Sequence, residues 1–130
     1  ANGDAAGAAD FCKWVEDVLV DVINMTKEKM EKYYDEHVTD TMCRNELYKK
    51  YYMDTIIEDT SAVAGLELIR RIVGMANVKD ITTIADEAKR ARAEKICITA
   101  AIDFFKNRSD KKCGKCFLKT LKDAIAEVDA

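Results

Sequence analysis

The chain of 130 residues contains no proline and only five glycines, and two of these glycines lie within the first nine residues. Sheet-rich folds need frequent turns, for which glycine and proline are the common residues, so this scarcity favours a few long helices. Apolar residues recur at helical spacing, and no segment alternates as a strand would. The sequence therefore predicts an all-α protein, with a flexible arm at residues 1–9 and a single compact bundle over residues 10–130.

Five helices are expected from the apolar spacing and from residues that suit helix ends. Asp40 is expected to cap the second helix, and Asp59, Thr60 or Ser61 the third, which stops at Gly74. Asp80 or Thr82-Thr83 is expected to cap the fourth, with Asp86 and Glu87 in its first turn. A tight reversal is expected at Asn107–Asp110, between the fourth helix and the fifth. The expected ranges are about 10–38, 41–54, 60–74, 80–106 and 111–128.

The five cysteines are expected to form disulfides. Two of them, Cys12 and Cys43, sit near opposite ends of the first helix. At about 1.5 Å per residue they are about 45 Å apart and cannot pair with each other. The sequence predicts two bridges that stabilise the bundle, each joining Cys12 or Cys43 to one of Cys97, Cys113 and Cys116, with one thiol left over.

Cys113-Gly-Lys-Cys116 also has the spacing of a redox pair. A thioredoxin-type pair lies at a helix N-terminus after a strand, whereas the residues before Cys113 predict a helix. A zinc site would need a second CxxC or paired histidines, and His37 is the only histidine. Ordinary disulfides are the favoured interpretation, and no metal or cofactor is predicted.

Several observations bear on function class. The sequence lacks the GxSxG, HExxH and phosphate-binding glycine motifs, and His37 has no obvious nucleophile partner, so no enzyme is predicted. The net charge of −3 argues against nucleic acid, and no uncharged apolar run is long enough to span a membrane. The cysteines, the sequons at Asn24 and Asn107, and a start without methionine predict a secreted, processed chain.

Two groups of side chains are candidate partner-binding surfaces. Tyrosines cluster at the junction of the first two helices, where they suit amphipathic packing or an interface. Lysines at 4, 4 and 3 spacing share one face of the last helix, which is either a solvated face or a dock for an acidic partner. The candidates are Tyr34, Tyr48, Tyr52, Lys111, Lys115, Lys119 and Lys122.

Three segments carry a resemblance to a known family: Phe11-Cys12-Lys13-Trp14, the tyrosine-rich Glu31–His37, and Cys113-Gly-Lys-Cys116-Phe117. On these segments the chain resembles the short helical salivary proteins of anopheline mosquitoes, which include albicin and anophensin. The resemblance implies a non-enzymatic inhibitor of host defence that binds a plasma protein, either of the alternative complement pathway or of the kallikrein–kinin contact system. The fifth cysteine departs from a two-bridge family.

Two other functions stay open at this point. Helical secreted bundles often enclose apolar cavities, so a carrier of a small apolar ligand such as a lipid or odorant is the main alternative. A structural or surface-coat fragment is the third. The sequence names no target, ligand or oligomeric state.

Overall fold

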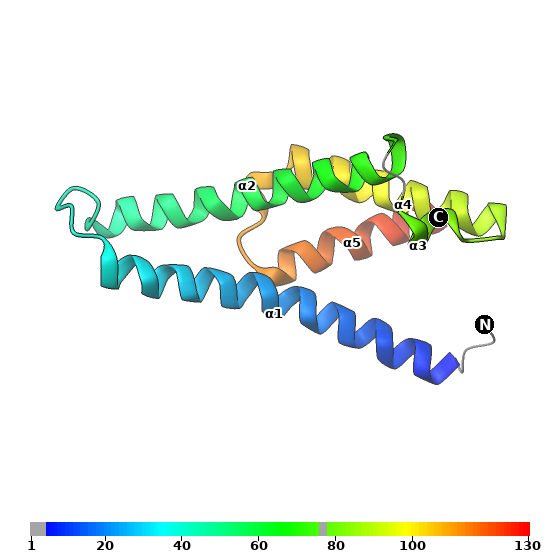
Figure 1. Ribbon diagram of the computed structural model, residues 1–130, viewed down its shortest axis with the longest axis horizontal. Coiled ribbons are helices and arrows are strands. Elements are labelled where there is room, and N and C mark those ends of the chain that lie inside the picture. Colours follow the sequence, from blue (N-terminus) through cyan, green and yellow to red (C-terminus); the bar gives the residue numbers. More distant parts are fainter. Residues whose placement is uncertain (1–4, 76–77) are drawn as a thin grey trace.

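The computed structural model describes residues 5–75 and 78–130, and Figure 1 shows their arrangement. These residues form five α-helices and one short 3-10 helix, and they contain no strand, which confirms the predicted all-α fold. The 3-10 helix η1 makes the reversal that was expected after the fourth predicted helix. The elements are α1 (Ala5–His37), α2 (Glu46–Val73), α3 (Lys79–Thr82), α4 (Glu87–Lys106), η1 (Arg108–Asp110) and α5 (Gly114–Asp129).

α2 is one continuous helix where the sequence predicted two. The predicted break fell at 59–61, but the hydroxyls there do not cap a helix. Thr60 Oγ1 donates to the carbonyl oxygen of Ile56 one turn back, at 2.8 Å. Ser61 Oγ donates to the carbonyl oxygen of Phe104 on α4, also at 2.8 Å. Because both hydroxyls find acceptors without ending the helix, α2 continues through the predicted break.

Asn45 sets the start of α2, and the prediction that Asp40 does so is wrong. The Asn45 side chain accepts hydrogen bonds from the backbone N–H groups of Leu47 at 2.9 Å and Tyr48 at 3.4 Å, as an N-cap does. Asp40 instead accepts from the N–H of Met42 at 2.8 Å, and this bond closes a turn in the α1–α2 connection.

The predicted fourth helix is also divided differently. The expected cap Asp80 lies inside the short α3, and the cap of α4 is Asp86, whose side chain accepts from the N–H of Lys89 at 3.0 Å. Asp86 was expected in the first turn of a longer helix. The predicted end of α2 is confirmed, because the N–H of Gly74 donates to the carbonyl oxygen of Arg70 at 3.2 Å.

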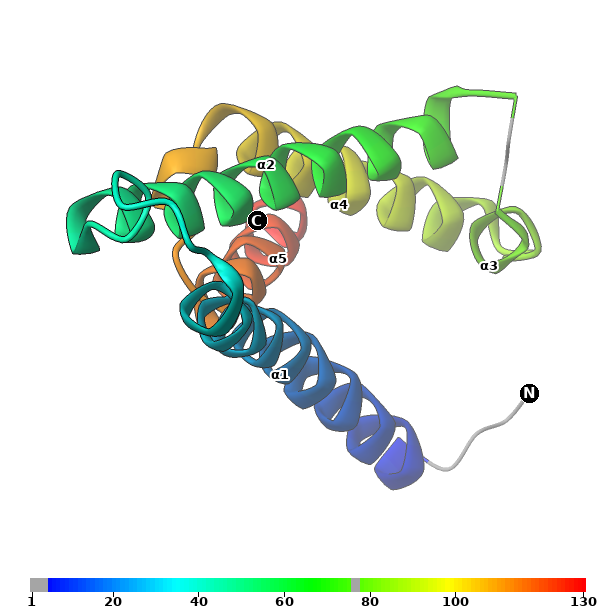
Figure 2. The same ribbon diagram turned by 60° about the vertical axis from the view of Figure 1, so that its left-hand side comes forward.

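α1 begins at Ala5, inside the expected flexible arm, while residues 1–4 of that arm lie outside the described part of the chain. Figures 1 and 2 show that α1 diverges from α2 and α4 toward its N-terminal end. None of the helices in the described residues is long and apolar enough to cross a membrane.

The core lies where α2, α4 and α5 meet. The rings of Phe104 and Phe117 pack with their centroids 5.3 Å apart, and both are almost fully buried. Partly buried side chains of α1, Leu19 and Ile23, close one side of this cluster. The buried members of the cluster are Ile57, Ala100, Phe104, Phe117 and Ala124.

Small residues bring α2 and α4 close together. A Cβ atom on Gly65 would lie 2.7 Å from the carbonyl oxygen of Ala101, which is closer than real Cβ contacts come. Ser61 and Ala62 on α2, and Ala100 on α4, are also buried. The two backbones can therefore approach more closely than larger side chains would allow, and this contact fixes the position of α4 on α2.

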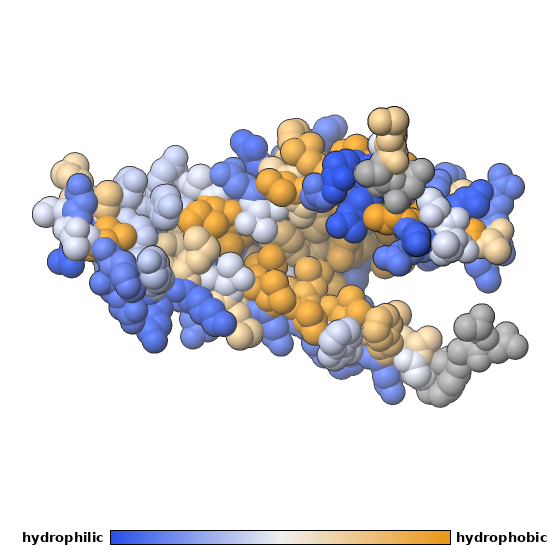
Figure 3. Space-filling view, in the orientation of Figure 1, coloured by the Kyte–Doolittle hydropathy of each residue, from blue (hydrophilic) through white to orange (hydrophobic). Residues whose placement is uncertain are grey.

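The N-terminal half of α1 carries an apolar face that the other described residues do not cover. In the structure Phe11 is 62% exposed and Val22 is 55% exposed, and Figure 3 shows hydrophobic residues along this half of the helix. We name these residues the α1 stripe; they are spaced by 4, 3, 4 and 3 positions. The stripe consists of Phe11, Val15, Val18, Val22 and Met25.

Candidate functional site

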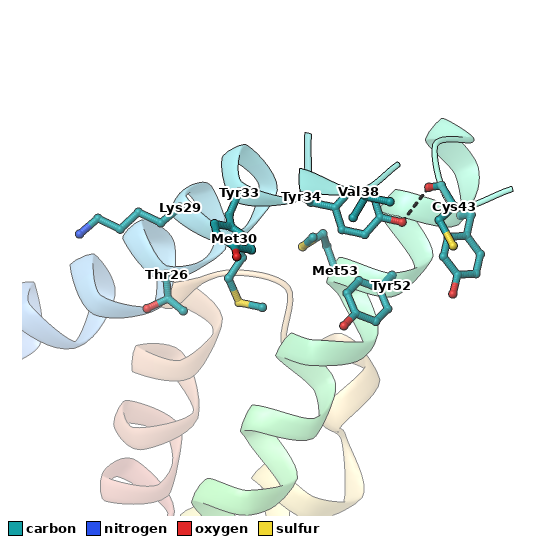
Figure 4. A pocket seen from close by; sticks show the side chains of 10 residues that line it. Thr26, Lys29, Met30, Tyr33, Tyr34, Val38, Cys43, Tyr52 and Met53 are labelled. Carbon is teal, nitrogen blue, oxygen red and sulfur yellow. Dashed lines mark hydrogen bonds between the residues drawn. The ribbon is translucent and has the colours of Figure 1, made fainter. Parts of the chain in front are cut away.

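A pocket of about 800 Å³ lies between the C-terminal half of α1 and the first turns of α2 (Figure 4). Its walls come from both helices and from the connection between them, so the α1–α2 hairpin alone forms it. Aromatic rings, two methionines and a valine make its lining mostly apolar. The lining residues are Thr26, Lys29, Met30, Tyr33, Tyr34, Val38, Cys43, Tyr48, Tyr52 and Met53.

Tyr34 holds the pocket together and is not the exposed partner-binding residue that the sequence suggested. Its side chain is only 9% exposed. Its hydroxyl donates to the carbonyl oxygen of Cys43 at 2.7 Å, which ties the connection back onto α1 (Figure 4). Burial raises the pKa of Tyr34 above its ordinary value, and the neighbouring Cys43 adds to this shift.

Of the three candidate tyrosines, Tyr48 and Tyr52 present open surface. Both rings are partly exposed, and they stack with their centroids 6.4 Å apart. The pKa of Tyr48 is raised by Cys43 first and by burial second. Its hydroxyl therefore stays protonated at neutral pH and acts as a hydrogen-bond donor rather than a base. The pocket offers ring faces and thioethers for binding, with few polar groups.

The cysteines lie in several separate places, and the prediction of two disulfides is wrong, because all five thiols are free. Cys12 is exposed on α1, Cys43 lines the pocket between α1 and α2, and Cys97 lies on α4. Only Cys113 and Cys116 approach each other, with their sulfur atoms 3.1 Å apart at the start of α5. Cys113 is the N-cap residue of α5, and the residues before it form η1 and an extended connection.

The predicted lysine stripe does not form one free face. Lys111 is only 8% exposed, and its Nζ lies 2.6 Å from a carboxylate oxygen of Asp103. Lys119 pairs with Asp123 one turn along α5, and Lys122 Nζ lies 2.7 Å from a carboxylate oxygen of Glu16 on α1. Lys115 is exposed, and no ion pair forms with it among the described residues. Three of the four lysines therefore pair with carboxylates, and only the pair of Lys111 with Asp103 is largely buried.

Asp103 is the centre of a polar network that sequence reasoning missed. One carboxylate oxygen accepts from Lys111 Nζ and from Thr120 Oγ1, each at 2.6 Å, and the other accepts from Asn107 Nδ2 at 2.6 Å. Burial opposes ionisation, but these three donors lower the pKa of Asp103 to about 2. The spacing of Asp103 and Asn107, four residues apart just before a reversal, was the available signal.

His37 is exposed at the C-terminal end of α1. Its ring stacks on Tyr33 with centroids 3.9 Å apart, and Nδ1 lies 3.0 Å from the carbonyl oxygen of Tyr33.

In residues 5–75 and 78–130, no three histidine, cysteine, aspartate or glutamate side chains gather as a metal site would require.

Comparisons with known proteins point to a kinase. No protein-family model and no solved structure matches the chain. Methylthioribose kinase 1 of Oryza sativa subsp. japonica is 27% identical over 124 residues, which cover 82% of this chain and 28% of that protein. Methylthioribose kinase of Bacillus pumilus is 28% identical over 90 residues, covering 69% of the chain and 23% of the relative. The Escherichia coli enzyme is 25% identical over 109 residues, covering 76% and 26%. The chain thus spans about a quarter of the length of these relatives.

These matches correct the functional predictions. The resemblance to mosquito salivary proteins is wrong, because the relatives are methylthioribose kinases of plants and bacteria. The prediction of a non-enzymatic binding protein, either an inhibitor of complement or contact activation or a carrier of an apolar ligand, is contradicted for the same reason, and so is the prediction that the chain is not an enzyme. Over most of its length, the chain is similar to part of several methylthioribose kinases.

Proposed function

We propose that this chain is a helical part of a larger protein that phosphorylates methylthioribose. The observation that carries the proposal is the similarity to methylthioribose kinases of rice and of two bacteria, which extends over 69–82% of the chain. The similarity does not depend on one short motif. It extends over more than two thirds of the chain, as similarity across a shared domain would.

The α1 stripe supports the larger assembly. Isolated exposed apolar residues are ordinary, but a contiguous row on one helix face marks a surface that packs against something. The chain spans 28% of the rice kinase, so such a protein has ample further polypeptide to cover the stripe. In this proposal the stripe is where the helical part packs against the rest of the kinase.

The proposal also gives the buried junction a role. Enzymes that transfer a phosphoryl group work mainly by positioning their substrates and by stabilising charge, and they need rigid supports for both. The α2–α4–α5 junction is such a support, because it combines close backbone contact at Gly65 with the Asp103 network.

The activity is tested on the full-length protein that carries this sequence. We expect release of ADP from ATP when methylthioribose is present, and little release with ribose, which lacks the methylthio group. The measurement is a coupled assay of ADP, with the phosphorylated sugar identified by mass spectrometry. A folded full-length protein that releases no ADP in response to methylthioribose would refute the proposal.

A pair of matched variants tests the role of the α1 stripe. Val22→Asp places a charge in the stripe, whereas Asp21→Lys changes the charge at the neighbouring exposed position. In the full-length protein we expect Val22→Asp to lower the melting temperature by several degrees and Asp21→Lys to leave it nearly unchanged. In the isolated 130-residue chain both variants should melt like the parent. Equal effects of the two variants in the full-length protein would show that nothing covers the stripe.

A further inference from the structure

Two thiols meet at the start of α5. The sulfur atoms of Cys113 and Cys116 lie 3.1 Å apart, and both side chains are partly exposed. A disulfide bond requires about 2.05 Å between the sulfurs, so they need to approach by only about 1 Å. The geometry already suits a bond between them, in contrast to Cys12, Cys43 and Cys97, which lie apart.

The surroundings of Cys116 favour its thiolate. Burial opposes ionisation, but several groups together lower the pKa of the Cys116 thiol below its ordinary value. They are the Cys113 thiol, the backbone N–H groups of Lys112 and Cys113, and the cation of Lys111. Burial instead raises the pKa of Cys97. Because the thiolate is the attacking species in disulfide exchange, Cys116 is the better nucleophile.

The turn that carries the two cysteines is held by contacts with α1 and α2. The N–H of Gly114 donates to the side-chain oxygen of Asn24 on α1 at 2.9 Å. A Cβ atom on Gly114 would collide with the backbone of Val20, so only glycine fits at position 114. Lys112 Nζ lies 2.6 Å from a carboxylate oxygen of Glu58 on α2. These contacts hold in place the backbone segment that carries the two sulfurs.

Cys116 is also reachable from solvent. It lines a surface cleft of about 290 Å³ together with Lys111 and Lys119, and the exposed Lys115 lies between the two cysteines in the sequence. Asp103, Asp110 and Asp123 line the same cleft, and Lys111 and Lys119 pair with Asp103 and Asp123, so the cleft is a polar one in which the lysine charges are balanced. We propose that Cys113 and Cys116 form a redox-active dithiol, which a low-molecular-weight disulfide such as glutathione disulfide oxidises to an intrachain disulfide.

The exchange proceeds in two balanced steps. The Cys116 thiolate attacks one sulfur of glutathione disulfide, forms a mixed disulfide, and releases the first glutathione as a thiolate that takes up a proton. Cys113 then loses its proton to water, and its sulfur attacks Cys116 Sγ, which forms the intrachain bond and releases the second glutathione. Two protein thiols are oxidised, and one glutathione disulfide is reduced to two thiols.

The experiment titrates the reduced 130-residue chain with mixtures of oxidised and reduced glutathione. Free thiols are then blocked with iodoacetamide, and the chain is digested with trypsin. Trypsin cuts after Lys112, Lys115 and Lys119, so an intrachain bond appears as peptide 113–115 joined to peptide 116–119. We expect this joined product, lighter by two hydrogens and free of alkyl groups, at ratios where the exposed Cys12 still carries mostly an alkyl group.

Three single variants separate the roles of the thiols. Cys113→Ser should trap glutathione on Cys116, because no second thiol can displace it. Cys116→Ser should slow the reaction at Cys113 by about tenfold or more, since the favoured thiolate is lost. Cys12→Ser is the matched control and should leave the joined product unchanged. Circular dichroism checks that each variant is folded, and if a variant is not, the wild-type peptide result alone decides.

Two outcomes would overturn the proposal. In the first, both peptides are found separately alkylated, or separately joined to glutathione, at the same ratios as Cys12. In the second, the reduced chain retains one zinc ion in native mass spectrometry and the ion blocks exchange, which would make the pair a metal ligand set.

Discussion

The α2–α4–α5 junction and the N-terminal half of α1 have the same kind of apolar spacing and opposite burial. Phe104 and Phe117 are almost fully buried at the junction, whereas Phe11 and Val22 in the α1 stripe are more than half exposed. The difference comes from the partners rather than from the helices themselves. At the junction, small residues such as Gly65 let two backbones approach, and α1 has no such contact along its stripe. Helical spacing therefore predicts an apolar face but does not predict what covers it.

The largest expected difference between the two regions comes from removing a phenylalanine ring in each. Phe117→Ala should destabilise the isolated chain by about 3–5 kcal/mol, because it leaves a cavity beside Phe104. Phe11→Ala should change the free energy of unfolding by less than about 0.5 kcal/mol, because that ring is exposed. Urea unfolding followed by circular dichroism measures both. Similar losses would mean that the stripe is covered in solution.

The close contact of α2 and α4 is tested by adding volume. Gly65→Val should destabilise the chain by about 1–3 kcal/mol, since its Cβ would meet the backbone oxygen of Ala101. Ala9→Val, at an exposed position of α1, should cost only the small helix-propensity difference of about 0.5 kcal/mol. Thermal melts of the two variants compare the regions, and a neutral Gly65→Val would refute the close approach of the two helices.

A smaller effect is expected from the buried hydroxyl of Ser61. Ser61→Ala removes the hydrogen bond to the carbonyl oxygen of Phe104 and should cost about 1 kcal/mol. Thr26→Ala on the exposed face of α1 should be neutral or slightly stabilising, because alanine favours helix. Chemical denaturation resolves this difference. A stable Ser61→Ala variant would show that the bond contributes nothing net.

The smallest effect is a dependence on pH. The folded pKa of Asp103, about 2, lies below the usual unfolded value of about 3.9. The carboxylate therefore stabilises the fold above about pH 5, and this contribution is lost as the pH falls through 4 toward 2. Because the side chain is about one-third exposed, we expect about 1 kcal/mol after solvent screening.

The variants Asp103→Asn and Asp17→Asn provide the comparison for this pH dependence. Asp103→Asn should flatten the loss of stability between pH 5 and pH 2, whereas Asp17→Asn, in an exposed pair with Lys13 on α1, should leave the profile unchanged. The measurement is the urea midpoint at several pH values. Identical profiles for the parent and Asp103→Asn would contradict the lowered pKa.

Most of the helical segments could be predicted from the sequence, because apolar spacing and the stop at Gly74 are local signals. The choice of caps could not. Asp40, Thr60 and Ser61 all suit a helix start, and only the neighbouring groups decide whether each one caps a helix, closes a turn or bonds to another helix. Asn45 caps α2 because its side-chain oxygen accepts hydrogen bonds from the N–H groups of Leu47 and Tyr48.

The candidate sites were predictable in part. The tyrosine cluster was recognised, and Tyr48 and Tyr52 do line a pocket, but the burial of Tyr34 depends on the path of the α1–α2 connection. Lys111 belonged to a regular spacing, yet it lies before α5 begins and points to Asp103. The similarity to methylthioribose kinases amounts to 27% identity over 82% of the chain, and none of the motifs considered in the sequence analysis revealed it.

The hydrogen bond between Gly114 and Asn24 has a consequence for the order of folding. It joins residues 90 positions apart, whereas the bond between Thr120 and Asp103 closes only 17 positions. Closing the longer loop costs about 1.5 kcal/mol more chain entropy. The α4–α5 hairpin should therefore form early, and α1 should dock last. In the native protein we expect α1, which docks last, to detach first. Amide hydrogens of α1 should therefore exchange with solvent before those of α4.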